Sequence, residues 1–197
     1  ISSVVYNGDT TFDVTYRISV INPSSLSLSQ VTLLDTPSNA LSSATLSVVD
    51  QPSIVASTAT LNPSAGSYPS LLTGGGNLLT GESLSLEYTL NVRPLDSSDA
   101  SLTAMLNQAQ VSAVDSAGTT VSDLTDFGTD PYDTNTGYDI ASTQGYDDPT
   151  PVVLNAVSSA KSVTNIVNNG NGTFDVTYVI ELLNVGNTLL DHFVLVD

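Results

Sequence analysis

The chain of 197 residues contains no cysteine and no tryptophan, one methionine, one histidine and three lysines or arginines. Without cysteine, a disulfide framework, a zinc–thiolate centre and a thiol nucleophile are excluded. One histidine cannot form a histidine-rich metal centre. Three cations cannot coat a phosphate backbone, so the composition argues against nucleic-acid binding. An anionic membrane surface would repel the chain.

Long hydrophobic runs are also absent, because no apolar stretch reaches the 18 or so residues that a membrane-spanning helix needs. The residues after Ile1 lack the charged and then apolar pattern of a signal peptide. They begin within a strand-like pattern instead, which is typical of a segment of a longer protein. The sequence therefore predicts no membrane insertion.

Acidic and apolar residues dominate what is present. Twenty aspartates and glutamates give a formal net charge of −17, while 40% of the residues are hydrophobic and the mean hydropathy is +0.13. This apolar content is too high for a disordered acidic chain and predicts a folded protein. Abundant small polar residues, few lysines and no cysteine are typical of a bacterial extracellular protein.

An internal repeat organises the chain. The segment VYNGDTTFDVTYRISVINPSSLSLSQVTLLD starts at Val5, and VNNGNGTFDVTYVIELLNVGNTLLDHFVLVD starts at Val167, an offset of 162 residues without a gap. A repeat of this length indicates a duplicated domain rather than a solenoid turn. We therefore expect one nearly complete repeat unit over residues 1–155, a linker over 156–162, and the first three strands of a second unit over 163–197.

Alternation of apolar and polar residues predicts strands. Every second residue is apolar from Phe12 to Val20, from Leu84 to Val92 and from Ala109 to Ala113, a period that places one apolar face on a sheet. Shorter strands are expected at Val31–Leu33 and at residues 151–154. With turn residues between the strands and no helical period, the fold class predicted is an all-β, antiparallel, Ig-like β-sandwich.

Two further segments favour turns or loops. Asn7-Gly8 and its counterpart in the second copy are tight-turn signals that precede an alternating strand. Residues 63–81 are rich in glycine, serine and proline, and we expect a loop or an irregular edge there. Gly74–Gly76 lack the lysine and the helix start of a phosphate-binding loop.

An aspartate-rich segment over residues 115–148 is the candidate metal site. Carboxylate and amide oxygens without histidine or cysteine favour calcium, and oxygens at alternate positions from Asp133 to Asp139 resemble the spacing of calcium loops. The candidate ligands are Asp115, Asp123, Asp126, Asp130, Asp133, Asn135, Asp139, Asp147 and Asp148. The alternative is a solvated acidic loop that confers solubility.

Lys161 raises a separate possibility, because a lysine near the start of a strand can form an isopeptide cross-link with Asn or Asp. The first copy contains no lysine. The sequence therefore predicts that such a bond is not a general device of the repeat.

The segment NGTFDVTYVIELLNVGNTLLDHFVLVD, Asn171–Asp197, resembles the opening of the tandem "conserved repeat" domain of bacterial surface proteins, an Ig-like domain of unknown function. The shared pattern is a glycine and an aromatic residue, Val, Tyr and Ile, then Asn-x-Gly and Val-x-Val-x-Asp. The first copy has Pro23-Ser24 where the second has Val185-Gly186. Residues 107–131 and 147–154 are similar to the closing strands and acidic tail of that family. The resemblance implies a stalk or matrix module without catalytic activity.

The function expected is that of a structural repeat module in a large extracellular or cell-surface protein, such as an adhesin stalk, with calcium as a stiffening ion. Its partners would be neighbouring repeat units or copies of itself. One alternative is a self-assembling filament or surface-layer subunit completed by strand addition between chains. Another is a carbohydrate-binding module in which Tyr132, Tyr138 and Tyr146 contact the sugar. Its partner would be a surface glycan or protein.

Overall fold

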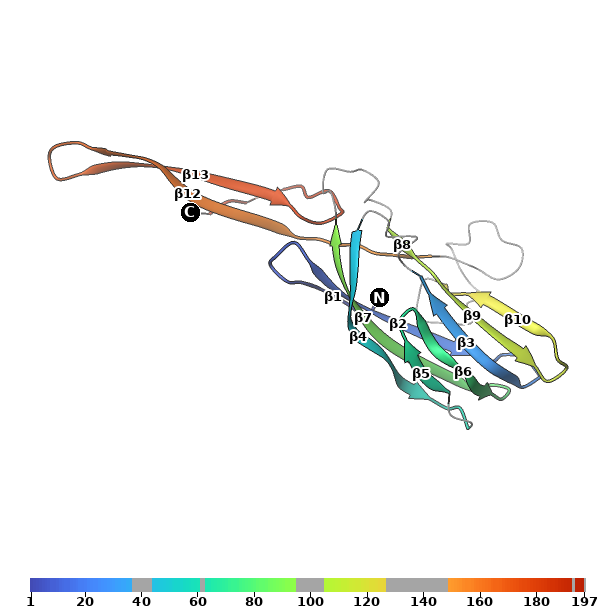
Figure 1. Ribbon diagram of the computed structural model, residues 1–197. Coiled ribbons are helices and arrows are strands. Elements are labelled where there is room, and N and C mark those ends of the chain that lie inside the picture. Colours follow the sequence, from blue (N-terminus) through green and yellow to red (C-terminus); the bar gives the residue numbers. More distant parts are fainter. Residues whose placement is uncertain (37–43, 61–62, 95–104, 127–148, 193, 197) are drawn as a thin grey trace.

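The computed structural model describes the chain apart from residues 37–43, 61–62, 95–104, 127–148, 193 and 197 (Figure 1). The described part is all-β, and every strand pair in it is antiparallel. It contains no helix that is long and apolar enough to cross a membrane. The all-β antiparallel class expected from the alternating sequence is therefore confirmed.

Two sheets form the main body of the molecule (Figure 1). The four-stranded sheet has the order β1 (Ser3–Tyr6), β2 (Phe12–Ile21), β7 (Ser83–Pro94) and β4 (Ala44–Ser57). The five-stranded sheet has the order β10 (Thr120–Leu124), β9 (Ala109–Asp115), β3 (Leu28–Asp35), β6 (Ser70–Leu78) and β5 (Ser64–Ser67).

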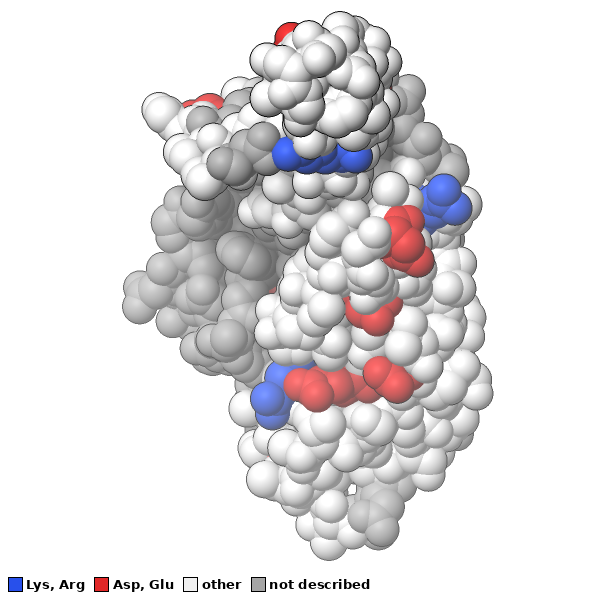
Figure 2. Space-filling view, turned by 90° about the vertical axis from the view of Figure 1, so that its left-hand side faces the viewer, with Lys and Arg blue, Asp and Glu red and all other residues white. Residues whose placement is uncertain are grey.

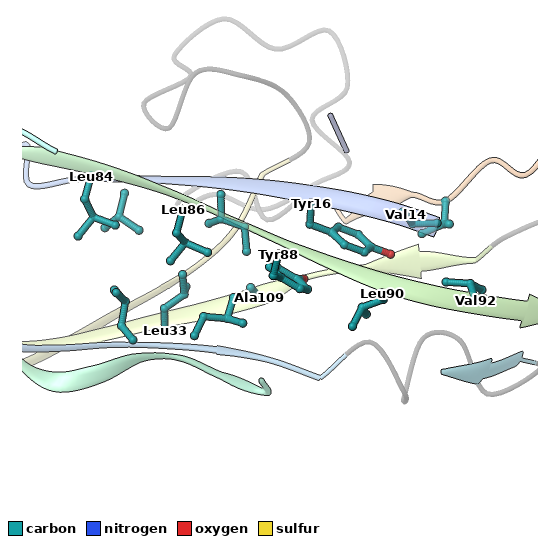
Figure 3. Close-up of a cluster of buried hydrophobic side chains, with 14 of the residues drawn as sticks. Val14, Tyr16, Leu33, Leu84, Leu86, Tyr88, Leu90, Val92 and Ala109 are labelled. Atoms are coloured by element: carbon teal, nitrogen blue, oxygen red, sulfur yellow. The ribbon is translucent and has the colours of Figure 1, made fainter. Parts of the chain in front are cut away.

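The apolar core lies between these sheets, so the body is a β-sandwich. Strands β2 and β7 pair along their whole length, from Phe12 opposite Val92 to Ile21 opposite Ser83. Their alternate residues point inward and meet Leu33 and Ala109 of the other sheet (Figure 3). The period of two read from the sequence is therefore the period of burial in both central strands.

The glycine-rich segment differs from the expected loop. Residues 64–67 and 70–78 form β5 and β6, and β6 lies inside the sheet between β3 and β5. Its register against β3 shifts at several points, which is the irregularity that Gly74–Gly76 allow. At Gly76 a Cβ atom would come within 2.5 Å of Pro63, so close backbone approach requires glycine there.

The end of the first unit is less regular than expected. Within 151–154, strand β11 (Thr150–Pro151) covers one residue and pairs with β8 (Leu106–Asn107). Val152 and Leu154 are nonetheless buried in the core. The predicted linker over residues 156–162 lies mostly in β12 (Val157–Asn168), which begins almost directly after this buried segment.

The repeat in sequence is a repeat in structure. Strands β12 and β13 (Phe174–Asn184) form a hairpin that projects from the sandwich (Figure 1). Its tip has the register of the β1–β2 hairpin, with Asn168 opposite Phe174 as Tyr6 is opposite Phe12. After Asn184 the described residues form no further strand, so the expected third strand of the second unit is not present among them.

The two turns also share their hydrogen bonds. Asn7 Nδ2 donates to Thr11 Oγ1 and Asp13 Oδ1, both at 3.0 Å. Asn169, its counterpart, donates to the equivalent Thr and Asp at 3.2 and 3.0 Å. Gly8 and Gly170 both adopt positive φ, +83° and +76°, which explains the Asn-Gly signal.

Candidate functional site

The nine predicted calcium ligands fall into two groups. Three lie in the described part of the chain and are treated below. The other six lie outside the described residues: Asp130, Asp133, Asn135, Asp139, Asp147 and Asp148. Among the described residues, no group of three or more His, Asp or Glu side chains is placed to hold a metal ion.

Asp115 closes the turn between β9 and β10. Its Oδ1 accepts hydrogen bonds from the backbone N–H groups of Ala117 at 2.9 Å and Thr119 at 2.8 Å. This carboxylate is thus a turn cap, a common use of Asp in a turn that contains Gly118. Asp123 pairs with Val111, about 13 Å further along the hairpin at the rise of an antiparallel strand. The fold therefore does not bring Asp115 together with Asp123.

Asp123 and Asp126 both line a pocket of about 470 Å³. The pocket opens between the two sheets, where β2 faces β9 and β10. Its other lining residues include Ile1, Tyr16, Ile18, Val20, Asn107 and Val111. It is a groove whose lining combines apolar side chains with the carboxylates of Asp123 and Asp126.

A buried polar cluster lies beside this groove. Asp35, at the end of β3, is fully buried, and its Oδ2 accepts hydrogen bonds from the Tyr88 hydroxyl and, at 3.0 Å, from Asn107 Nδ2. Tyr88 stacks on Tyr16, with ring centroids 5.2 Å apart, and the two labelled rings lie side by side in Figure 3. The cluster therefore joins β3 and β8 to both central strands of the opposite sheet.

Burial sets the protonation of this cluster. Loss of water around Asp35 raises the pKa of its carboxyl to about 7, and the hydrogen bond from Asn107 opposes that rise. The same desolvation raises the pKa of Tyr16 and brings that of Tyr68 to about 12, with the Asp35 charge adding to both shifts. Because its pKa lies near neutral pH, a small change in the groups around Asp35 can switch its carboxyl between the protonated and the ionised form.

The hydrogen bonding of the cluster is incomplete. Within the described residues, Asp35 Oδ1, Asn107 Oδ1 and Tyr16 Oη are buried and have no hydrogen-bond partner. Native structures rarely leave such atoms unsatisfied, because each costs about 1–3 kcal/mol. Three unsatisfied polar atoms near the Asp35 carboxyl indicate that a hydrogen-bond donor from another group is expected there.

A second cluster holds the two repeat units together. Asn187 follows the hairpin and is buried; its Oδ1 accepts from the Leu154 N–H and its Nδ2 donates to the Val152 C=O, both at 2.7 Å. A Cβ atom on Gly186 would come within 2.0 Å of the Leu154 carbonyl oxygen, so this contact needs glycine. The Gly of the Asn-x-Gly pattern therefore belongs to a junction between copies.

Sequence reasoning missed both clusters as sites. Asp35 and Asn107 are 72 positions apart, and no spacing rule connects them. The signals available were the recurrence of Asp35 as Asp197 and the position of Asn107 before a closing strand. Asn187 carried no signal, because its counterpart in the first copy is Ser25.

Comparisons with known proteins add no assignment to this geometry. A scan of protein-family models and searches of curated proteins and solved structures found nothing that matches the chain.

Proposed function

We propose that the chain is part of a tandem array of Ig-like repeat units that serves as a spacer in a large bacterial extracellular or cell-surface protein. The observation that carries the proposal is the recurrence of one hairpin, with the same register and the same turn bonds, directly after the sandwich. A spacer needs only a stable unit and a defined connection to the next one. Catalysis is not part of the proposal.

The junction supports a stiff connection. Strand β12 starts three residues after the buried Leu154, and Asn187 and Gly186 fasten the base of the second hairpin to Val152 and Leu154. A linker with few residues outside ordered structure has little freedom to bend. Successive units would then keep a fixed angle.

Surface charge supports the same role. On the described part of the face in Figure 2 most residues are uncharged, and the acidic side chains stand in small groups. With a formal net charge of −17, neighbouring arrays would repel one another and stay soluble.

Small-angle scattering and limited proteolysis of the full chain test the proposal. A spacer is expected to be a monodisperse, elongated monomer that resists proteolysis over the sandwich. Concentration-dependent fibres in electron micrographs would replace it with the filament alternative. The exposed apolar side chains Phe174, Val176 and Tyr178 on β13 are the observation that favours this alternative.

The carbohydrate alternative rests on Tyr132, Tyr138 and Tyr146, which lie outside the described residues. A glycan array separates it from the spacer, since binding to a defined sugar would favour a recognition module. Silence across the array would leave the three tyrosines without a role in glycan binding.

The junction yields a first prediction. Asn187→Ala should leave the buried Leu154 N–H and Val152 C=O without partners, at a cost of about 1–3 kcal/mol for each. The expected result is faster hydrogen exchange at the Leu154 amide and a wider distribution of maximum dimensions in scattering. Ser25→Ala, at the equivalent exposed position of the first copy, is the matched control and should change neither. Unchanged Leu154 exchange in Asn187→Ala would contradict the clamp.

Calcium binding by the aspartate-rich segment belongs to the same proposal, as the ion that stiffens the unit. Extracellular modules bind calcium with dissociation constants of about 10⁻⁴–10⁻³ M. At free calcium about one hundred times that constant, the fold should gain about 2.7 kcal/mol. Scanning calorimetry with calcium and with EGTA measures this gain. Identical melting temperatures would remove calcium and leave the solvated acidic loop.

A further inference from the structure

The sequence starts at Ile1, the counterpart of Val163, so the first copy of the hairpin includes only the part of its first strand that lies next to the turn. In the second copy β12 pairs with β13 along its whole length, from Val157 opposite Asn184 to Asn168 opposite Phe174. In the first copy β1 pairs with β2 only from Ser3 opposite Thr15 to Tyr6 opposite Phe12. The stretch of β2 from Tyr16 onward therefore lacks the neighbour that its counterpart in β13 has.

This stretch of β2 is an open sheet edge. Thr15 C=O accepts a hydrogen bond from the Ser2 N–H, so the backbone of Thr15 points away from β7. Backbone direction alternates along a strand, hence Arg17, Ser19 and Ile21 present their N–H and C=O groups to the same side. No described strand pairs with them there, and the 470 Å³ groove runs along this edge. Such an edge accepts an added strand.

The second copy shows which strand fits. Lys161 lies opposite Ile180 and Val163 opposite Tyr178. At the offset of 162, Ile180 corresponds to Ile18 and Tyr178 to Tyr16, both of which line the groove. In the proposed tandem array, a preceding unit of the same sequence would place a lysine opposite Ile18, on the face that looks into the groove. The position that corresponds to Lys161 lies before Ile1. The lack of lysine in residues 1–155 is therefore no argument against a lysine cross-link in the repeat.

The lysine of such a strand would point toward the buried cluster. In the second copy Lys161 Nζ lies 4.4 Å from the centroid of the Tyr178 ring. A lysine in the same place over Tyr16 enters the region where Tyr16 Oη, Asn107 Oδ1 and Asp35 Oδ1 lack partners. An amine or ammonium group supplies the donors that these atoms require. The carboxylates of Asp123 and Asp126 on the groove wall complement a positive charge.

We propose that the groove holds a lysine-bearing strand, the counterpart of Val157–Val163 that joins one unit to the next, and that its lysine amine forms an amide bond with Asn107. The inference rests on the proposed tandem array, because the array supplies the strand. It deepens that function by giving each unit a covalent lock between its first strand and β8.

The condensation balances without any further reagent. The neutral amine attacks Cγ of Asn107, the new C–N bond forms, and the bond from Cγ to Nδ2 breaks to release ammonia. Burial among Tyr16, Tyr68 and Tyr88 favours the neutral amine, which is the nucleophile. Asp35 Oδ2 lies 3.0 Å from the leaving Nδ2. Asp35 gives one proton to that nitrogen and receives one from the attacking amine, so it ends as it began.

A peptide of residues 155–162, NAVSSAKS, added to the full chain tests the groove directly. The expected product is an adduct whose intact mass equals protein plus peptide minus one ammonia, with the cross-link mapped to Asn107 by fragmentation. The matched control is the same peptide with Lys161→Arg, which keeps the strand and the charge but removes the nucleophile. Asn107→Asp should still react, with loss of water in place of ammonia, and Asp35→Asn should slow the reaction at least tenfold.

A tethered variant of the protein covers the case in which a short peptide binds too weakly to react. With residues 155–162 duplicated ahead of Ile1, the strand is tethered and its effective concentration is high. The purified chain should weigh one ammonia less than its sequence, and its arginine variant should not. Full mass in the tethered chain, with protection of the Arg17 and Ser19 amides, would overturn the covalent step. Full mass without that protection would overturn the strand site as well. Neither result would alter the scattering test of the spacer.

Discussion

Replacing Phe12 by alanine is expected to lower the free energy of unfolding of the sandwich by about 3–5 kcal/mol. Phe12 is 1% exposed, packs its ring 5.1 Å from that of Tyr6, and belongs to the main core cluster. Truncation removes a whole aromatic side chain and leaves a cavity that neighbouring strands cannot fill without breaking their pairing. Urea unfolding followed by tyrosine fluorescence measures the loss, since the chain has eight tyrosines and no tryptophan.

The internal repeat provides the matched control. Phe174 has the same position in the second hairpin and the same local sequence, yet it is 57% exposed. Phe174→Ala should therefore shift the stability of the sandwich by no more than about 0.5 kcal/mol. Equal losses for the two variants would show that β13 is buried in solution, which would favour assembly between chains. A small loss for Phe12→Ala would contradict the core itself.

Strands with a clean period of two could be predicted from the sequence. In β2 and β7 one face is fully buried and the other partly exposed, so apolar and polar residues alternate strictly. The tight turn at Asn7-Gly8 was equally legible, because its positive φ requires a residue such as glycine. These signals are local, and they fixed the sandwich class and the repeat.

Other strands left no such signal. Strand β4 is a long edge strand with most of its residues exposed, so nothing selects an alternating pattern over Ala44–Ser57. In β6 the three glycines give the segment the composition of a loop, so the sequence did not predict a strand there, although Leu71, Leu72 and Leu78 are buried. Propensity and pattern fail where burial is weak or where close packing replaces side chains.

The candidate site could not be predicted from short sequence patterns, for a different reason. Asp35, Tyr88 and Asn107 come from three strands, and each is unremarkable in its own segment. Only the pairing of β3 with β9 and the packing of one sheet on the other place them around one carboxyl. The aspartate-rich segment attracted attention because its residues are adjacent in sequence, whereas Asp35, whose pKa is raised to about 7 by burial, stands alone in its segment.

Asp35 should make the protein less stable as the pH rises from about 4 to about 7. Its pKa is raised from 3.8 to about 7 by burial, so in this interval the folded state keeps a proton that the unfolded state releases. The folded state then binds more protons, and the free energy of unfolding falls with increasing pH. Below the interval both states are protonated and above it both are ionised, so the effect of this group ends at each limit. The full change is at most about 4 kcal/mol.

Two asparagine variants separate this effect from the general repulsion among the acidic residues. Asp35→Asn removes the titrating group but keeps an acceptor for the Tyr88 hydroxyl, so it should flatten the curve by most of that amount. Asp50→Asn removes one exposed carboxylate from β4 and changes the net charge equally, so it should retain the wild-type slope. Denaturant midpoints at pH 5 and pH 8 for the three proteins measure the difference.

The groups that face Asp35 make the interpretation of this curve specific. Tyr88 and Asn107 bond to its Oδ2, and Tyr16 and Tyr68 lie near enough for its charge to raise their pKa values further. The Asn107 amide does not titrate, and the pKa values of Tyr16 and Tyr68 are raised further above this interval, so the slope lost in Asp35→Asn belongs to the carboxyl. A bound lysine ammonium would stabilise the ionised carboxyl and lower its pKa, whereas a completed amide bond would bring no positive charge. The pH dependence of the free energy of unfolding should therefore differ between the tethered chain and its arginine variant. This comparison tests for the amide bond without mass spectrometry.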